Sequence, residues 1–144
     1  MTLIRPVVLY GSETWTLRKV EETRLAVFER KILKRIYGPY IDFDTEEWRI
    51  RHNDELKNLF QKPDIISEIN RRRLMWAGCV WRKEGSLIKA VIKENPTGKR
   101  PLGRPRLRWK DRIKKDVKAV EPNTQWREAA EDRKRWRQTS LQGW

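Results

Sequence analysis

Hydrophobic residues recur at intervals of three and four along much of this chain, and that spacing restricts it to amphipathic helices. The clearest case is a stripe of four residues with charged positions on the other faces: Leu25, Phe28, Ile32 and Ile36. Thr16 is a suitable N-cap for this helix, and Gly38 followed by Pro39 favours its end at about Tyr37. A helix is therefore predicted over 17–37.

The same reasoning predicts further helices. Asp64 is a good N-cap, and the apolar stripe that begins with Ile65 and Ile69 predicts a helix over 65–82. Residues 86–93 fit either a short helix or a strand. The remaining expected helices cover 42–60, 106–120 and 124–137. The fold class predicted is mainly α, with about five amphipathic helices and no substantial sheet.

Hydrophobic and charged residues each make up 38% of the chain. Average globular proteins have about 45–50% apolar and about 25% charged residues, so a thin core is expected. Residues 1–16 form an apolar lead-in that has little to pack against by itself. We divide the chain into a helical segment over 1–40, a second helical segment over 41–94, and a basic arm with C-terminal helices over 95–144.

Positive charge is concentrated in the middle of the chain. The formal net charge is +14, and residues 61–120 carry 18 basic and 6 acidic side chains, whereas residues 1–60 carry 11 and 10. A localised excess of this size indicates a surface for a polyanion. We therefore expect RNA, DNA or both as partners, bound mainly through phosphates.

Residues 95–106 contain three Pro and two Gly among basic residues, which predicts an extended arm followed by a cationic helix. Gly103-Arg104-Pro105 resembles the core of an AT-hook, but Leu102 stands where that motif has Arg, so general phosphate contacts are preferred. A solvated linker remains an alternative for the arm. The predicted nucleic-acid-binding residues are Arg71, Arg72, Arg73, Lys99, Arg100, Arg104, Arg106, Arg108, Lys110, Arg112, Lys114 and Lys115.

Eight tryptophans add a second recognition element. Trp81 and Trp136 are flanked by arginines, so they are the candidates for stacking on unpaired bases. The tryptophans at helical apolar positions are expected in the core instead: Trp76, Trp109 and Trp126.

Nothing in the sequence indicates an active site. The chain has one cysteine, Cys79, and one histidine, His52, too few for a disulfide or for a typical zinc site. Cys79 is expected to be a small buried hydrophobe and His52 a helix-surface residue. The acidic cluster over 42–47 is interpreted as a helix start that complements the macrodipole, not as a two-metal site. We expect no catalytic residue, metal or cofactor.

No apolar run approaches the length of a membrane span, and Arg5 and Pro6 interrupt the only apolar start. The sequence therefore predicts an intracellular protein, in the nucleus or the cytoplasm, with no membrane partner.

Several blocks of the chain together resemble one family, and in order they cover essentially its whole length. The blocks are LIRPVVLYGSETWTL, FERKILKRIYG, NDELKNLF..PDIISEINRRRLMWAGCVWR, GKRPLGRPRLRWKD and W..AAEDRKRWR. They resemble the C-terminal part, thumb and post-thumb, of non-LTR (LINE-type) retrotransposon endonuclease–reverse transcriptases. The family commonly has His where this chain has Cys79, so any role of that His would be lost.

The resemblance implies a thumb-like helical segment in the first 40 residues and an RNA- or DNA-binding region after it. It also implies that the polymerase palm, with its metal-binding carboxylates, and the endonuclease lie outside this sequence. The expected function is that of a nucleic-acid-binding C-terminal fragment without catalysis of its own, which would contact an upstream palm if the full-length parent has one. The alternative is a helical protein–protein interaction module derived from a mobile element.

Overall fold

A computed structural model describes residues 3–42, 46–94 and 108–142. This part of the chain is mainly α-helical, which confirms the predicted fold class. Its helices are α1 (Ile4–Leu9), α2 (Lys19–Tyr37), α3 (Asn53–Phe60), α4 (Ile65–Arg82), α5 (Leu87–Lys93), α6 (Trp109–Val120), α7 (Trp126–Glu131) and α8 (Arg133–Gln142). A short 3-10 helix lies at Ser12–Thr14, and β1 (Tyr40–Ile41) pairs antiparallel with β2 (Trp48–Arg49).

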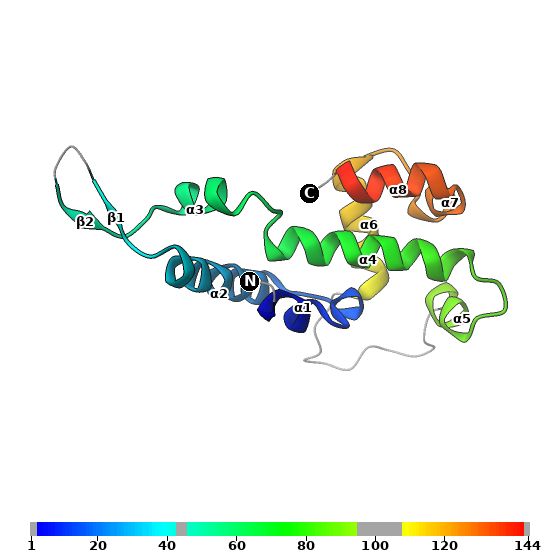
Figure 1. The fold of residues 1–144 in the computed structure, drawn as a ribbon. Coiled ribbons are helices and arrows are strands. Elements are labelled where there is room, and N and C mark those ends of the chain that lie inside the picture. The colour runs from blue at the N-terminus through cyan, green and yellow to red at the C-terminus, as the bar shows by residue number, and fades with distance from the viewer. Residues whose placement is uncertain (1–2, 43–45, 95–107, 143–144) are drawn as a thin grey trace.

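The long helix α4 is the axis of the molecule (Figure 1). It begins where the sequence predicts, because the Asp64 carboxylate accepts hydrogen bonds from the backbone N–H groups of Ile66 and Ser67, at 3.0 and 2.9 Å. It contacts α1, α2 and the 3-10 helix on one side and α6, α7 and α8 on the other. Because so many elements pack on it, α4 is buried over much of its circumference.

The core consists of two small clusters along α4. The first joins α4, α6, α7 and α8 through Leu74, Ala77, Ile113, Val117, Trp126, Ala129, Ala130 and Trp136. The second joins α1 and the segment before α2 to the start of α4 through Leu9, Leu17, Ile65 and Ile69. Trp126 is in the core as predicted, whereas Trp76 and Trp109 are half-buried and meet edge to face at 5.2 Å.

The helix predicted over 42–60 is wrong in its first half. The chain pairs Tyr40 with Arg49 and Ile41 with Trp48, and the helix begins only at Asn53, after His52. Aromatic and β-branched residues here favour a strand, and the Trp48 side chain is 69% exposed, so it belongs to no helical stripe. The interpretation of the acidic cluster as a helix start is therefore also wrong.

The C-terminal helix predicted over 124–137 is divided in two. Asp132 has an extended ψ of 113°, and its carboxylate accepts from the backbone N–H of Lys134 at 2.8 Å, so it starts a new helix. The described residues hold eight α-helices where about five are predicted from the spacing, because this C-terminal helix is divided and because residues 4–9 and 87–93 also form helices. The ambiguous segment 86–93 is a helix.

The lead-in packs only in part: Leu9 is 3% exposed, whereas Leu3 and Val7 are 83% and 76% exposed. Cys79, expected to be buried, is exposed, because the buried face of α4 passes through Ala77, Gly78 and Val80 instead. Every helix within 3–42, 46–94 and 108–142 is too short or too polar to cross a lipid bilayer.

Candidate nucleic-acid interface

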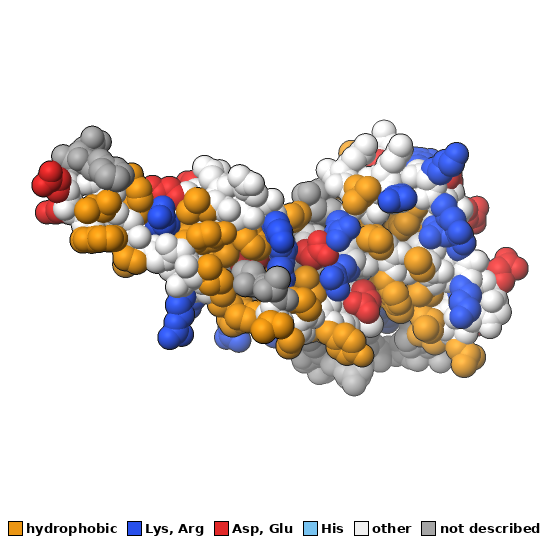
Figure 2. Space-filling view, viewed as in Figure 1, with side chains coloured by type: hydrophobic (Ala, Val, Ile, Leu, Met, Phe, Trp, Pro, Cys, Tyr) orange, Lys and Arg blue, Asp and Glu red, His pale blue; other side chains and the backbone are white. Residues whose placement is uncertain are grey.

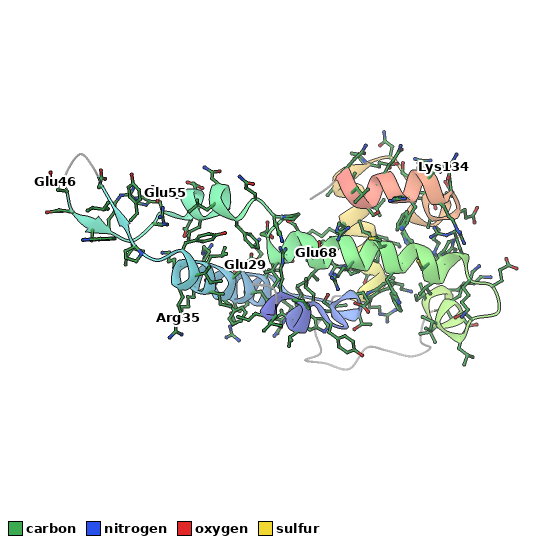
Figure 3. The ribbon with its side chains drawn as sticks, in the orientation of Figure 1. Glu29, Arg35, Glu46, Glu55, Glu68 and Lys134 are labelled. Atoms are coloured by element: carbon green, nitrogen blue, oxygen red, sulfur yellow. The ribbon has the colours of Figure 1, made fainter. Side chains whose placement is uncertain are left out.

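The three consecutive arginines of α4 do not form one basic surface. Arg71 and Arg72 both bind the Glu68 carboxylate, at 2.8 and 3.0 Å, and this holds the pKa of Glu68 below its usual value although burial opposes the shift. Figure 3 shows Glu68 near the start of α4, beside α1. The charges of these two arginines are therefore partly neutralised within the fold.

Arg73 is fully buried and is a structural residue. Its guanidinium binds the Asp116 carboxylate at 2.5 Å and donates to the Trp15 carbonyl at 3.2 Å. Arg112 binds the other oxygen of Asp116 at 3.1 Å and also pairs with Glu22, with its own side chain only 12% exposed. The prediction that Arg73 contacts phosphate is wrong for this fold, since water and ligands cannot reach its side chain.

Arg112 was also predicted to bind nucleic acid, and two acidic partners already bind it. The sequence does hold a signal for this network. Asp116 falls on the stripe of Ile113 and Val117, which is the buried face of α6, and a buried carboxylate requires a cationic partner.

Trp136, the second stacking candidate, is also buried. Its side chain is 2% exposed and its indole N–H donates to the Leu74 carbonyl at 2.7 Å, so it cannot stack on a base. The Trp81 ring is half-buried and is contacted by the Lys89 ammonium, the Arg127 guanidinium and the Trp126 ring. A base would have to compete with these neighbours, and stacking on Trp81 stays a prediction.

Four of the predicted residues of the basic arm lie outside the described residues: Lys99, Arg100, Arg104 and Arg106. Arg108 precedes α6 and its backbone N–H donates to the Asp111 carboxylate at 3.4 Å. Lys115 is exposed on α6.

A hollow of about 470 Å³ lies beside α6, and we call it the α6 groove. Its described lining residues are Lys93, Lys110, Lys114, Lys118, Thr124, Gln125, Trp126 and Arg127. Five of them are cationic and none is acidic, so the positive potential in the groove is not cancelled by its own walls.

Three helices and the loop before α7 build the groove. Lys110, Lys114 and Lys118 are four residues apart, so they fall in one row along α6. Lys93 comes from the end of α5 and Arg127 from the first turn of α7. In the described part of the chain, Lys93, Lys114 and Lys118 form no ion pair, in contrast to the three consecutive arginines of α4.

Of the residues predicted from the sequence to bind nucleic acid, Lys110 and Lys114 line the groove. The prediction did not include the other three cations of the groove, which are Lys93, Lys118 and Arg127. The spacing of four from Lys114 is a signal that could have found Lys118. For Lys93 and Arg127 the sequence holds no such signal, because tertiary packing alone brings α5 and α7 to α6.

The site is therefore a basic groove in a small helical protein, the kind of surface to which polyanions bind. No family model matches the chain, and no solved structure matches it. The chain is 29% identical over 141 residues to an uncharacterized protein of Caenorhabditis elegans described as transposon-derived. The aligned region is 94% of this chain but only 50% of the relative, so the chain spans about half the length of that protein. The similarity supports a mobile-element origin for this chain.

Proposed function

We propose that this chain is a nucleic-acid-binding C-terminal segment of a non-LTR retrotransposon reverse transcriptase, without catalysis of its own. The observation that carries the proposal is the α6 groove, with five cationic and no acidic residues in the part of its lining that the structure describes. Lys93, Lys114 and Lys118 form no ion pair among the described residues, and cations of this kind release counterions when they bind phosphates, which is the main source of affinity for nucleic acids.

Two further observations support the proposal. The similarity to a transposon-derived protein agrees with the family that the sequence blocks resemble. Residues 61–120 carry the excess of positive charge, and Lys93 and the lysine row on α6 belong to that part of the chain. An upstream palm, if the parent protein has one, would supply the polymerase chemistry, and this chain would hold RNA or DNA.

A binding assay tests this function. Labelled single-stranded and duplex oligonucleotides are titrated with the chain in low-salt buffer, with a polyglutamate of matched length as a competitor. We expect binding that excess unlabelled nucleic acid abolishes. A chain that is folded by circular dichroism and binds neither RNA nor DNA would refute the proposal.

A helical protein–protein interaction module is the second candidate, and one observation favours it. Apolar side chains gather over α1, α2 and the hairpin in Figure 2, and Leu3, Val7 and Tyr10 are each more than three-quarters exposed. For such a module the basic residues would serve only solubility. Its function should then survive replacement of Arg104, Arg106, Arg108 and Lys110 by Gln, whereas nucleic-acid binding should weaken.

A further inference from the structure

We infer that the α6 groove takes a single strand of nucleic acid and that a duplex touches only its rim. The inference rests on the proposed function and deepens it, because it names the form of nucleic acid that this groove accepts. It rests on the size of the groove and on the spacing of its lysines.

The size of the groove suits one nucleotide. Pockets for small ligands have volumes of about 300–1,000 Å³, and the groove, at about 470 Å³, falls within that range. A nucleotide with its sugar and phosphate is a ligand of this size. A duplex is far wider, and its paired bases are closed to a hollow of this kind.

The lysine row fits one strand. Lys110, Lys114 and Lys118 are successive residues of a single helix face, and a rise of about 1.5 Å per residue separates neighbours by about 6 Å along α6. Neighbouring phosphates of one extended strand have a similar separation. The row can therefore follow one sugar–phosphate backbone, with Lys93 and Arg127 coming from α5 and α7, and it is the size of the groove that distinguishes a single strand from a duplex.

The wall of the groove holds two hydrogen-bond donors without an acceptor among the described residues. They are the indole N–H of Trp126, whose side chain is 4% exposed, and the Nε–H of Arg127. A buried donor that lacks an acceptor costs about 1–3 kcal/mol. Both atoms are inaccessible to solvent in this structure, so an oxygen in the groove does not reach them, and the preference for a ligand rests on the size of the groove and on its cations.

The aromatic part of the wall also suits unpaired bases. The Arg127 guanidinium lies over the rings of Trp81 and Trp126, at 5.0 and 5.8 Å from their centroids. Arg127 and Trp126 both line the groove, and a guanidinium is a group on which an unpaired base can stack. Stacking of this kind needs the base to be unpaired and is tolerant of its identity.

The test compares two double variants of the full chain by fluorescence anisotropy with labelled oligo(dT), oligo(U) and a duplex DNA of the same length. Lys114→Gln/Lys118→Gln removes two groove charges, and Lys34→Gln/Arg35→Gln removes two exposed charges from α2. Arg35 projects away from the body of the molecule in Figure 3, so this pair is a matched control. Both variants are checked for native helix content by circular dichroism.

The expected result has three parts. The wild-type chain binds a single strand more tightly than the duplex; the groove variant loses about tenfold or more in single-strand affinity; and the α2 variant loses clearly less. Equal losses in the two variants, or a duplex preference, would overturn this inference and leave the proposed function standing. A folded chain that binds none of the three probes would remove the proposed function as well.

Lysine acetylation in the presence of saturating oligo(dT), read by mass spectrometry, locates the strand without any substitution. Protection is expected at Lys93, Lys114 and Lys118 and not at Lys34. Uniform protection, or none at the groove lysines, would count against the assignment even if the chain binds the oligonucleotide.

Discussion

The buried pair of Arg73 and Asp116 is the residue-scale feature on which the fold depends most. Asp116 of α6 receives two guanidinium groups, from Arg73 of α4 and from Arg112 of its own helix, and Arg112 reaches Glu22 of α2. One carboxylate therefore connects three helices. A buried ion pair is costly to break by removing one partner, because the other charge is left in the interior.

We predict that Asp116→Asn lowers the free energy of unfolding by about 3–5 kcal/mol, because it leaves Arg73 buried without its counter-ion. Urea denaturation followed by tryptophan fluorescence measures the change. The control Glu131→Gln alters an exposed acid of α7 and should shift stability by less than about 0.5 kcal/mol.

The double variant Arg73→Met/Asp116→Leu tests the cause. If the loss arises from an uncompensated charge, replacing both partners by apolar residues should lower stability much less than Asp116→Asn does. A double variant as unstable as the single one would show that shape, not charge, determines the effect.

Gly78 is a second residue with a large predicted effect. A Cβ atom at this position would lie 2.3 Å from the Trp136 ring, and that ring is held by its hydrogen bond to the Leu74 carbonyl. Helix propensity alone predicts that Gly78→Ala stabilises α4, by about 0.5–1 kcal/mol. The close approach of α4 and α8 predicts the opposite.

We expect Gly78→Ala to lower the free energy of unfolding by about 1–3 kcal/mol, since α8 must shift or Trp136 must leave its rotamer. Thermal denaturation shows whether the variant is less or more stable than the wild-type chain. Cys79→Ala, at the exposed neighbouring position, is the control and should change little. A stabilised Gly78→Ala chain would mean that the two helices do not approach as closely as the structure has them.

At the scale of elements, the sequence predicts a helix well where the apolar stripe and the capping residue agree. For α4, Asp64 and the stripe through Ile65 and Ile69 give the observed bounds. The sequence does not predict the hairpin at 40–49, because two strands of two residues each are too short to show an alternating pattern. The hairpin depends on contacts with α3, which the local sequence does not reveal.

Arg49 provides that contact. Its guanidinium binds the Asp42 carboxylate at 3.3 Å and the Glu55 carboxylate at 2.6 Å, so it ties β2 to the start of α3, where Figure 3 shows Glu55. Together with the His52 backbone N–H, which donates to Glu55 at 2.8 Å, Arg49 lowers the pKa of Glu55 to about 2.

The lowered pKa predicts a pH dependence. Because the folded-state pKa lies below the ordinary value of 4.5, ionised Glu55 stabilises the hairpin–α3 contact above about pH 4.5, and this contribution is lost as the pH falls toward 2. Arg49→Gln should raise the pKa of Glu55 toward 4.5, as NMR titration of the side-chain carboxyl can measure. Lys57→Gln on the same helix should leave it unchanged, and a wild-type Glu55 that titrates near 4.5 would contradict the contact.

At the scale of the whole molecule, the basic residues divide into two groups that the sequence alone does not separate. Arg71, Arg72 and Arg73 of α4, together with Arg112, are bound by Glu68, Asp116 and Glu22 and serve the fold. Lys93, Lys114 and Lys118 have no such partners among the described residues and remain available to a ligand. Clustered charge predicts the kind of partner from sequence, but only the fold shows which cations face it.

The salt dependence of nucleic-acid binding tests this account most directly. If three to five groove cations contact phosphates of a single strand, the plot of log K against log salt should have a slope of about −2 to −3.5. The slope should become shallower in the Lys114→Gln/Lys118→Gln variant. A folded chain whose binding is insensitive to salt, or that binds no nucleic acid in dilute buffer, would contradict the central claim that the α6 groove binds phosphates.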